Sequence, residues 1–215
     1  MLRSSREPML IGIDASRATV GQRTGTETYS RQLIRALIEL RSEHRFRLYT
    51  NGAMHVPGVP ELPAVAVRAI PFPRLWTHVR LSAEMLTRPP DVLFVPAHVL
   101  PLIHPRRSVV TVHDLGYLRY PDAHRPADRR YLGWSTRWNA TQATAMLADS
   151  QATKDDLVRA YGISPSKIHV IYLGRDEALG PVRDPDMLAA AQERFGITGR
   201  YLLYVGTLQP RKNLA

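Results

Sequence analysis

The chain has 215 residues, of which 44% are hydrophobic, and it carries a formal net charge of +10. This composition is typical of a soluble globular protein with one large domain or one and a half. Because the chain has no cysteine, disulfides and thiolate metal sites are excluded, which fits a cytoplasmic protein. No apolar run reaches the roughly 18 residues needed to cross a bilayer.

Short apolar runs alternate with amphipathic stretches, which favours parallel βαβ units and therefore the α/β class. Several runs are too short and too uniformly apolar for half-exposed antiparallel strands. The pattern predicts strands at residues 10–13, 45–49, 65–70, 92–95, 108–112, 145–148 and 168–172. Helices are predicted at about 26–41, 74–87, 127–144, 151–161 and 187–195.

The last fifteen residues join an apolar run, 201–205, to Gly206, the basic pair Arg211-Lys212 and what looks like a helix start. Glycine lets backbone approach an anion and a helix N-terminus favours negative charge, so this segment predicts a phosphate site. The alternative is an ordinary last strand followed by a basic tail. A strand and a helix start begin a domain rather than finish one.

Gly180-Pro181 is typical of a hinge. We therefore predict one domain over residues 1–180. Residues 181–215 are predicted to form a linker helix and the first strand of a second, incomplete domain.

Parallel sheets bind ligands beyond the carboxyl ends of their strands, which selects the loops at 14–25, 96–100 and 113–120. Gly25 directly precedes the clearest helix, where a phosphate could approach backbone N–H groups, although a plain glycine turn is the alternative. His113 directly follows a strand, and its ring can meet a hydroxyl or phosphate oxygen. It could equally be a strand-end histidine that bonds to nearby backbone. His98 has the same kind of position.

Arginine supplies nearly all of the positive charge, because only three of the 29 basic residues are lysine. Residues 119–138 interleave arginines with aromatic residues, and Arg74, Trp76 and Arg80 repeat the mixture. Such stretches suit nucleic acid, sugars or a membrane interface. The alternatives are amphipathic helices with inward aromatics, and an arginine excess that only reflects a GC-rich genome.

Six segments together resemble glycosyltransferase family 4, a large family of retaining enzymes with the two-domain GT-B fold. They read IGID at 11–14, GTETY at 25–29, DVLFVP at 91–96, TVHDL at 111–115, ADS at 148–150 and YVGTLQPRKNL at 204–214. No single segment is specific, but their order is. The resemblance implies a Rossmann-like parallel sheet flanked by helices, the N-terminal half of a GT-B fold, plus the first strand of a truncated second domain.

The resemblance also implies roles for particular residues. His113 would be the catalytic residue, near the transferred sugar or the acceptor. Gly25, Arg211 and Lys212 would bind the diphosphate of a nucleotide-sugar donor. The acceptor-side candidates are Asp14, His98 and Asp114. This family needs no metal, and no cofactor is expected.

Two departures from the family pattern affect the donor site. Thr24 stands where the family often has a second glycine, and Thr207 stands where many members have an arginine. The family's paired glutamates would lie beyond Ala215.

The predicted function is therefore the acceptor-side part of a retaining hexosyltransferase that acts on a polysaccharide, glycolipid or similar acceptor. It would be cytoplasmic and could contact an anionic membrane peripherally, and the 215 residues alone would be inactive. The alternatives are a catalytically inactive sugar- or partner-binding module, and a basic nucleic-acid-binding protein, which the dispersed arginines and the lack of a recognised motif disfavour.

Overall fold

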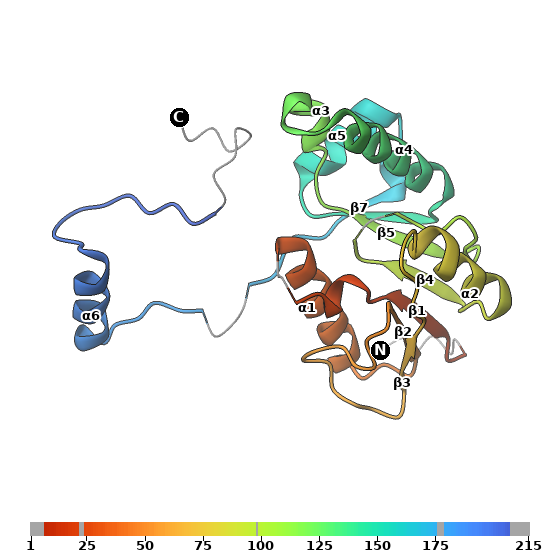
Figure 1. The fold of residues 1–215 in the computed structure, drawn as a ribbon, viewed down its shortest axis with the longest axis horizontal. Helices are drawn as coiled ribbons and strands as arrows, with labels where there is room; N and C mark the ends of the chain where they lie inside the picture. The colour runs from red at the N-terminus through yellow and green to blue at the C-terminus, as the bar shows by residue number, and fades with distance from the viewer. Residues whose placement is uncertain (1–6, 22–23, 98, 176–178, 207–215) are drawn as a thin grey trace. The chain divides into compact units, whose positions relative to one another are not determined.

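A computed structural model describes residues 7–21, 24–97, 99–175 and 179–206. The chain divides into two compact units, Met1–Tyr172 and Leu173–Ala215, which are described separately. The first unit is a parallel sheet with helices on both faces (Figure 1).

Seven parallel strands form the sheet, in the order β3-β2-β1-β4-β5-β6-β7. Their bounds are β1 Leu10–Asp14, β2 Arg45–Thr50, β3 Val65–Ala69, β4 Val92–Val95, β5 Ser108–Val112, β6 Ala145–Ala148 and β7 Ile168–Val170. Each strand lies at a predicted segment, so the predicted α/β class and parallel sheet are confirmed.

The strand order reverses between β1 and β4, which pair in register from Ile11↔Val92 to Ile13↔Phe94. Such a reversal is the point at which doubly wound sheets bind their ligands. Gly12 sits at the centre of β1, and a Cβ there would lie 2.7 Å from Pro90 Cγ and 2.8 Å from a Tyr49 ring carbon. Glycine is therefore required by packing at this position.

The helices of the first unit cover the two faces unequally. α1 (Gly25–Glu39) covers one face, and α2 (Ser82–Thr87), α4 (Pro126–Gln142) and α5 (Gln151–Tyr161) cover the other (Figure 1). A short helix, α3 (Gly116–Arg119), follows β5. The remaining turns are η1 (Arg17–Thr19), η2 (Thr77–Leu81), η3 (Pro121–Ala123) and η4 (Pro165–Lys167).

The predicted helix at 74–87 begins later than expected and changes type along its length. A π-helical segment, η2, precedes α2, and Leu75 before it has a left-handed φ of 54°. The start is set by Trp76, which is buried and donates its indole N–H to the carbonyl of Ile70 at 2.7 Å. With that residue anchored in the core, regular helix begins only beyond it.

The second unit contains α6 (Pro185–Phe195). Asp184 caps its first turn by accepting a hydrogen bond from the backbone N–H of Asp186 at 3.0 Å, and Gly196 ends it with φ 64°. Residues 201–206 contain no strand, although an apolar strand was predicted there. An extended segment needs a hydrogen-bonding neighbour, and the described residues of this unit offer none. The domain boundary near residue 180 stays a prediction.

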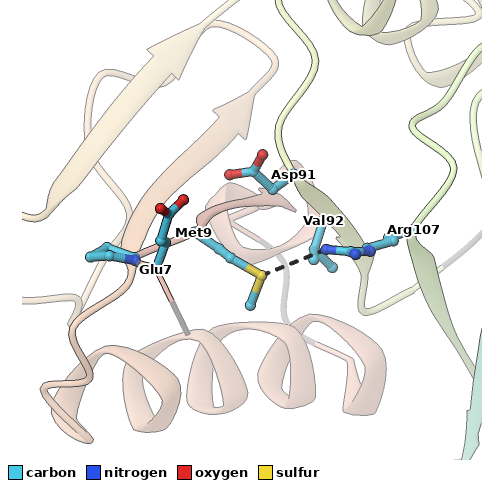
Figure 2. A pocket seen from close by; sticks show the side chains of 6 residues that line it. Glu7, Met9, Asp91, Val92 and Arg107 are labelled. Atoms are coloured by element: carbon cyan, nitrogen blue, oxygen red, sulfur yellow. Dashed lines mark hydrogen bonds between the residues drawn. The ribbon is translucent and has the colours of Figure 1, made fainter. Parts of the chain in front are cut away.

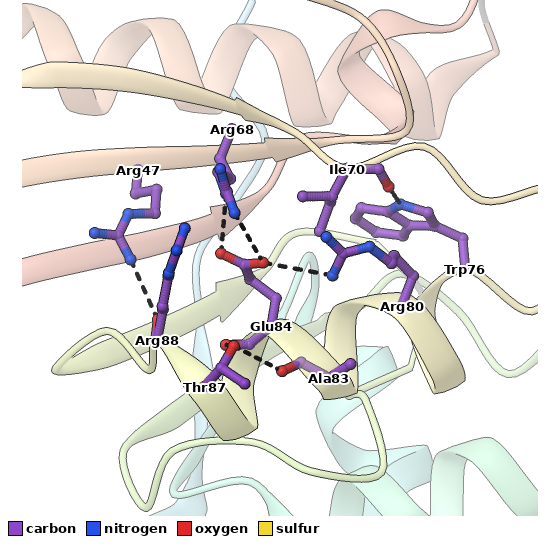
Figure 3. Close-up of polar contacts among 9 residues, drawn as sticks. All are labelled: Arg47, Arg68, Ile70, Trp76, Arg80, Ala83, Glu84, Thr87 and Arg88. Carbon is purple, nitrogen blue, oxygen red and sulfur yellow. Dashed lines mark hydrogen bonds and ion pairs between the residues drawn. The ribbon is translucent and has the colours of Figure 1, made fainter.

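A buried carboxylate links β3 to the helix that follows it. Glu84 is 2% exposed and accepts from Arg68 Nε at 3.0 Å and from Arg80 Nη1 at 3.4 Å (Figure 3). Arg68 belongs to β3 and Arg80 to η2, so the cluster ties the edge of the sheet to α2. Arg80 is therefore held in an ion pair with a buried carboxylate.

We expect Glu84→Gln to lower the free energy of unfolding by about 2 kcal/mol, because it removes the charge on which two charged hydrogen bonds depend. The matched control is Glu39→Gln, which breaks the half-exposed pair with Arg35 and should cost at most about 0.5 kcal/mol. Urea unfolding of the three proteins measures both values. Equal costs for the two variants would contradict a structural role for Glu84.

Candidate functional site

The carboxyl ends of β1, β5 and β6 place Asp14, His113 and Asp149 along one edge of the sheet. β5 and β6 pair in parallel with Val112 opposite Ala148. His113 directly follows β5 and Asp149 directly follows β6, so the two side chains lie next to one another. Sheet register, rather than any local motif, creates this pair.

Three contacts fix His113 in place. Its Nδ1 lies 2.6 Å from Asp149 Oδ2. Its ring packs edge-on against Tyr29, with centroids 4.8 Å apart and an interplanar angle of 87°. Its backbone carbonyl accepts from the Thr153 hydroxyl at 3.0 Å. The histidine is held by α1 on one side and by the start of α5 on the other.

The second ring nitrogen of His113 is the atom available to a ligand. His113 Nε2 is buried and has no partner among the described residues. Asp149 Oδ1 is likewise buried and has no partner among the described residues. Buried polar atoms are normally paired, so a polar ligand would satisfy these two atoms. His113 Nε2 can pair with a hydroxyl or a phosphate oxygen, whereas the carboxylate oxygen of Asp149 can only accept, as from a hydroxyl.

Gly25 lies at the start of α1, where a Cβ would meet nothing within 4 Å. Neither packing nor a left-handed φ requires glycine there, and the space beside it is open. Tyr29 lies one turn further along α1 and touches His113. The helix that begins at Gly25, the predicted diphosphate-binding residue, therefore contacts His113, the predicted catalytic residue, through Tyr29.

A carboxylate already occupies the first turn of α1. Glu27 is buried and accepts from the backbone N–H of Thr24 at 3.0 Å, from the Thr24 hydroxyl, and from Arg17 Nη1 at 3.2 Å. The hydrogen bond from Thr24 is the largest cause of its lowered pKa. A diphosphate at Gly25 would meet this negative charge, offset in part by Arg17.

Asp14, an acceptor-side candidate, is the last residue of β1 and only 3% exposed. Its Oδ1 accepts from the backbone N–H of Ser16 at 3.0 Å, and its Oδ2 has no partner among the described residues. Burial raises its pKa to about 6, against the opposing effect of the hydrogen bonds from Ser16. The contacts it makes hold the β1–α1 loop.

Asp114, another acceptor-side candidate, is exposed beside His113 and accepts from the backbone N–H of Gly116 at 2.8 Å. That bond shapes the turn into α3. The remaining predicted site residues, His98, Arg211 and Lys212, lie outside the described residues, so their roles stay predictions.

Sequence reasoning missed three residues of the site: Tyr29, Asp149 and Thr153. Asp149 carried a usable signal, because it follows its strand by one residue, as His113 does. Tyr29 recurs with Leu33 and Leu37 at four-residue spacing, which by itself indicates only the apolar stripe of a helix. Thr153 carries no signal in the sequence, since both contacts depend on how helices pack across the sheet.

The arginine–aromatic stretch divides between core and surface. On α4, Trp134 stacks on Trp138 with centroids 6.1 Å apart, and Tyr131 and Trp134 are 45% and 43% exposed. Nε2 of His78, in η2, lies 2.9 Å from the Tyr131 hydroxyl oxygen. Burial lowers the pKa of His78.

For Arg74, Trp76 and Arg80, the structure supports the alternative of an inward-facing aromatic residue over an exposed surface made by all three. Trp76 is 8% exposed, because the core accepts its ring and Ile70 accepts its indole N–H. Arg80 pairs with Glu84 (Figure 3). Of this group, Arg74 is exposed.

A hollow at the amino-terminal ends of β1 and β4 is lined in part by Glu7, Met9, Asp91 and Arg107 (Figure 2). Arg107 Nη1 lies 4.0 Å from Met9 Sδ, and Asp91 accepts from the backbone N–H of Leu10 at 2.7 Å. Ligands of doubly wound sheets bind at the opposite edge, so this hollow is separate from the candidate site.

In the part of the chain that the structure describes, none of the helices is long and apolar enough to cross a membrane. Nowhere in residues 7–21, 24–97, 99–175 and 179–206 do three or more His, Asp or Glu side chains gather as a metal site would need.

Comparison with known proteins identifies a family. Residues 23–179 match the model of Glycosyltransferase Family 4. The chain is 25% identical, over a 218-residue alignment, to O-antigen chain mannosyltransferase B of Escherichia coli, covering 89% of this chain and 54% of that protein. It is 26% identical over 117 residues to O-antigen chain mannosyltransferase RfbU of Salmonella typhimurium, covering 54% of this chain and 29% of that protein.

Solved structures share the fold. Anabaena HepE in complex with UDP-glucose superposes with a TM-score of 0.57 at 16% identity, covering 87% of this chain and 50% of that one. Sucrose-phosphate synthase from Thermosynechococcus elongatus superposes with a TM-score of 0.55 at 14% identity, covering 88% and 53%. O-antigen chain mannosyltransferase B, HepE and sucrose-phosphate synthase each match most of this chain. The chain spans about half the length of each of them.

The raised pKa of Asp14 predicts how stability changes with pH. The folded state holds this proton more tightly than the unfolded state, whose pKa is near 3.8. The stabilisation is therefore fully present below about pH 3.8 and lost as the pH rises to about 6. Asp14→Asn cannot ionise, so wild type should lose roughly 3 kcal/mol relative to this variant between about pH 4 and pH 7.

Urea unfolding at several pH values measures this difference, with Glu39→Gln as the control for a half-exposed carboxylate. A stability difference between wild type and Asp14→Asn that stays constant across that pH range would contradict the shift.

Proposed function

Because the chain belongs to glycosyltransferase family 4, we propose that it is the acceptor-side half of a retaining hexosyltransferase. The enzyme would move a sugar from a nucleotide-sugar donor to a hydroxyl of a polysaccharide or glycolipid acceptor. The match to residues 23–179 carries this proposal, because it spans Gly25, His113 and Asp149.

The names of similar proteins support the substrate class. Two relatives are named O-antigen chain mannosyltransferases, which favours a mannosyl donor and a polysaccharide acceptor. Anabaena HepE was solved in complex with UDP-glucose, which favours a nucleotide sugar as the donor. A cytoplasmic location fits such a donor and stays part of the proposal.

The chemistry to be assisted is departure of a nucleoside diphosphate, which gains negative charge as the glycosidic bond breaks. Positive groups aimed at that charge lower the barrier. We assign this task to Arg211 and Lys212, helped by the N-terminal end of α1 at Gly25. His113 would touch the transferred sugar or the acceptor, and the contacts from Asp149 and Tyr29 fix its ring before substrate binds. No metal or other cofactor is part of the proposal.

A catalytically inactive sugar-binding module is the second candidate. It would use the same edge of the sheet without turnover. One observation separates the two candidates. If the chain is part of an enzyme, the longest natural polypeptide that contains these 215 residues transfers sugar; if it is a binding module, that polypeptide does not.

The test uses that longest natural polypeptide with GDP-mannose or UDP-glucose and a membrane lipid extract as the source of acceptor. NMR of the product should give the same anomeric configuration as the donor. The 215 residues alone should not turn over either donor. Binding of a donor without transfer would favour the module, and inversion of configuration would contradict the proposed mechanism.

In the active polypeptide, His113→Ala should lower kcat by about 100-fold and leave the KM for the donor nearly unchanged. A contact made mainly in the transition state lowers kcat and kcat/KM together. His169→Ala is the matched control, because His169 is exposed on β7. An unchanged kcat in His113→Ala, with the circular dichroism spectrum intact, would remove His113 from the mechanism.

Peripheral contact with an anionic membrane is a further part of the proposal, because polysaccharide precursors are often lipid-linked. On α4, Arg129, Arg130 and Trp134 are exposed. Each arginine near an anionic surface contributes about 1 kcal/mol. Arg129→Ser/Arg130→Ser should therefore reduce co-sedimentation with phosphatidylglycerol vesicles at low salt by roughly tenfold or more, and salt should weaken binding of the wild type.

The control is Arg45→Ser/Arg107→Ser, which removes the same charge at the amino-terminal edge of the sheet. Equal loss in both double variants would indicate a net-charge effect. Equal binding of the wild type to phosphatidylcholine vesicles would contradict an electrostatic contact.

A further inference from the structure

Asp149 is placed beside His113 by the sheet itself. The register of β5 and β6 aligns Val112 with Ala148, so the two following residues meet. Asp149 Oδ2 lies 2.6 Å from His113 Nδ1. The histidine and aspartate side chains are 24% and 14% exposed, so little solvent competes for this bond.

Two neighbours make the geometry rigid. Ser150 caps α5 by accepting from the backbone N–H of Thr153 at 3.1 Å. The Thr153 hydroxyl then donates to the His113 carbonyl at 3.0 Å. Asp149 directly precedes the cap, where the positive end of the helix dipole favours a carboxylate.

The bond to Asp149 determines which ring nitrogen carries hydrogen. An ionised carboxylate has no hydrogen to donate, so His113 Nδ1 must be the donor. The other nitrogen, Nε2, is buried and lacks a partner among the described residues. A hydrogen there would leave a buried N–H unpaired, which is costly, so the bare nitrogen is favoured.

We propose that Asp149 is a positioning residue that holds His113 in the Nδ1–H form, so that Nε2 accepts a hydrogen bond from a sugar hydroxyl rather than donating one to a phosphate. That the hydroxyl belongs to a sugar rests on the proposed function. The form of the ring does not, because it follows from the contacts of this chain.

The test is a nitrogen-15 NMR spectrum of the histidine rings in the 215-residue chain at about pH 7.5, since ring nitrogens with and without hydrogen resonate far apart. His113→Gln identifies the His113 signals. In the wild type, Nδ1 should carry hydrogen and Nε2 should not. In Asp149→Asn, whose amide can donate to Nδ1, a mixture of the two neutral forms should appear, and in Asp149→Ala the protected Nδ1–H proton signal should vanish.

Asp156→Asn is the matched control, because Asp156 is another partly buried carboxylate near α5 that pairs with Arg119 and Arg159 instead. It should leave the His113 signals unchanged. Hydrogen on Nε2 in the wild type would overturn the proposal. So would an unchanged spectrum in both Asp149 variants.

Inorganic pyrophosphate is the probe for the competing role. Addition of pyrophosphate should leave Nε2 of His113 without hydrogen. If Nε2 gains a hydrogen when pyrophosphate is added, the proposal that His113 recognises a hydroxyl is overturned. In a polypeptide that transfers sugar, Asp149→Ala should lower kcat by roughly 10- to 100-fold while Asp156→Asn does not. Failure of transfer in every protein, with the wild-type ring as expected, would contradict the proposed function and leave the role of Asp149 intact.

Discussion

The parallel register of the central strands is the constraint on which the candidate site depends. Because β1, β4, β5 and β6 run in one direction and pair in register, their last residues come to the same edge. Asp14 ends β1, and His113 and Asp149 each follow a strand by one residue. A slip of one residue between β5 and β6 would turn Asp149 to the other face and break the pair.

Opposing charges meet at the same edge. Glu27 adds a negative group near the start of α1. Asp14 adds a second one only as the pH rises through about 6, because burial raises its pKa to about that value. Arg17 offsets Glu27. The cationic groups that a diphosphate needs therefore have to come largely from elsewhere, which is consistent with the role proposed for Arg211 and Lys212.

Much of the fold could be predicted from sequence, because fully buried parallel strands give short, uniformly apolar runs. The strand at 108–112 and the histidine after it are examples. The start of the helix near Arg74 could not, since it depends on where the core accepts Trp76. The spacing of Tyr29 from Leu33 and Leu37 indicates only an apolar helix stripe, yet Tyr29 packs against His113, 84 positions away. Contacts of that kind follow from packing across the sheet and leave no local pattern.

The distribution of unpaired buried atoms bears on whether this edge binds a ligand. Within the described residues, six buried side-chain atoms lack a partner, and three of them belong to Asp14, His113 and Asp149. Each such atom costs about 1–3 kcal/mol. The other three belong to Tyr49, His78 and Trp138, and no two of these adjoin one another as His113 and Asp149 do. A purely structural edge would gain by replacing these groups with apolar ones. Their concentration at the carboxyl ends of β1, β5 and β6 therefore favours a site whose remaining hydrogen bonds are completed by a polar ligand.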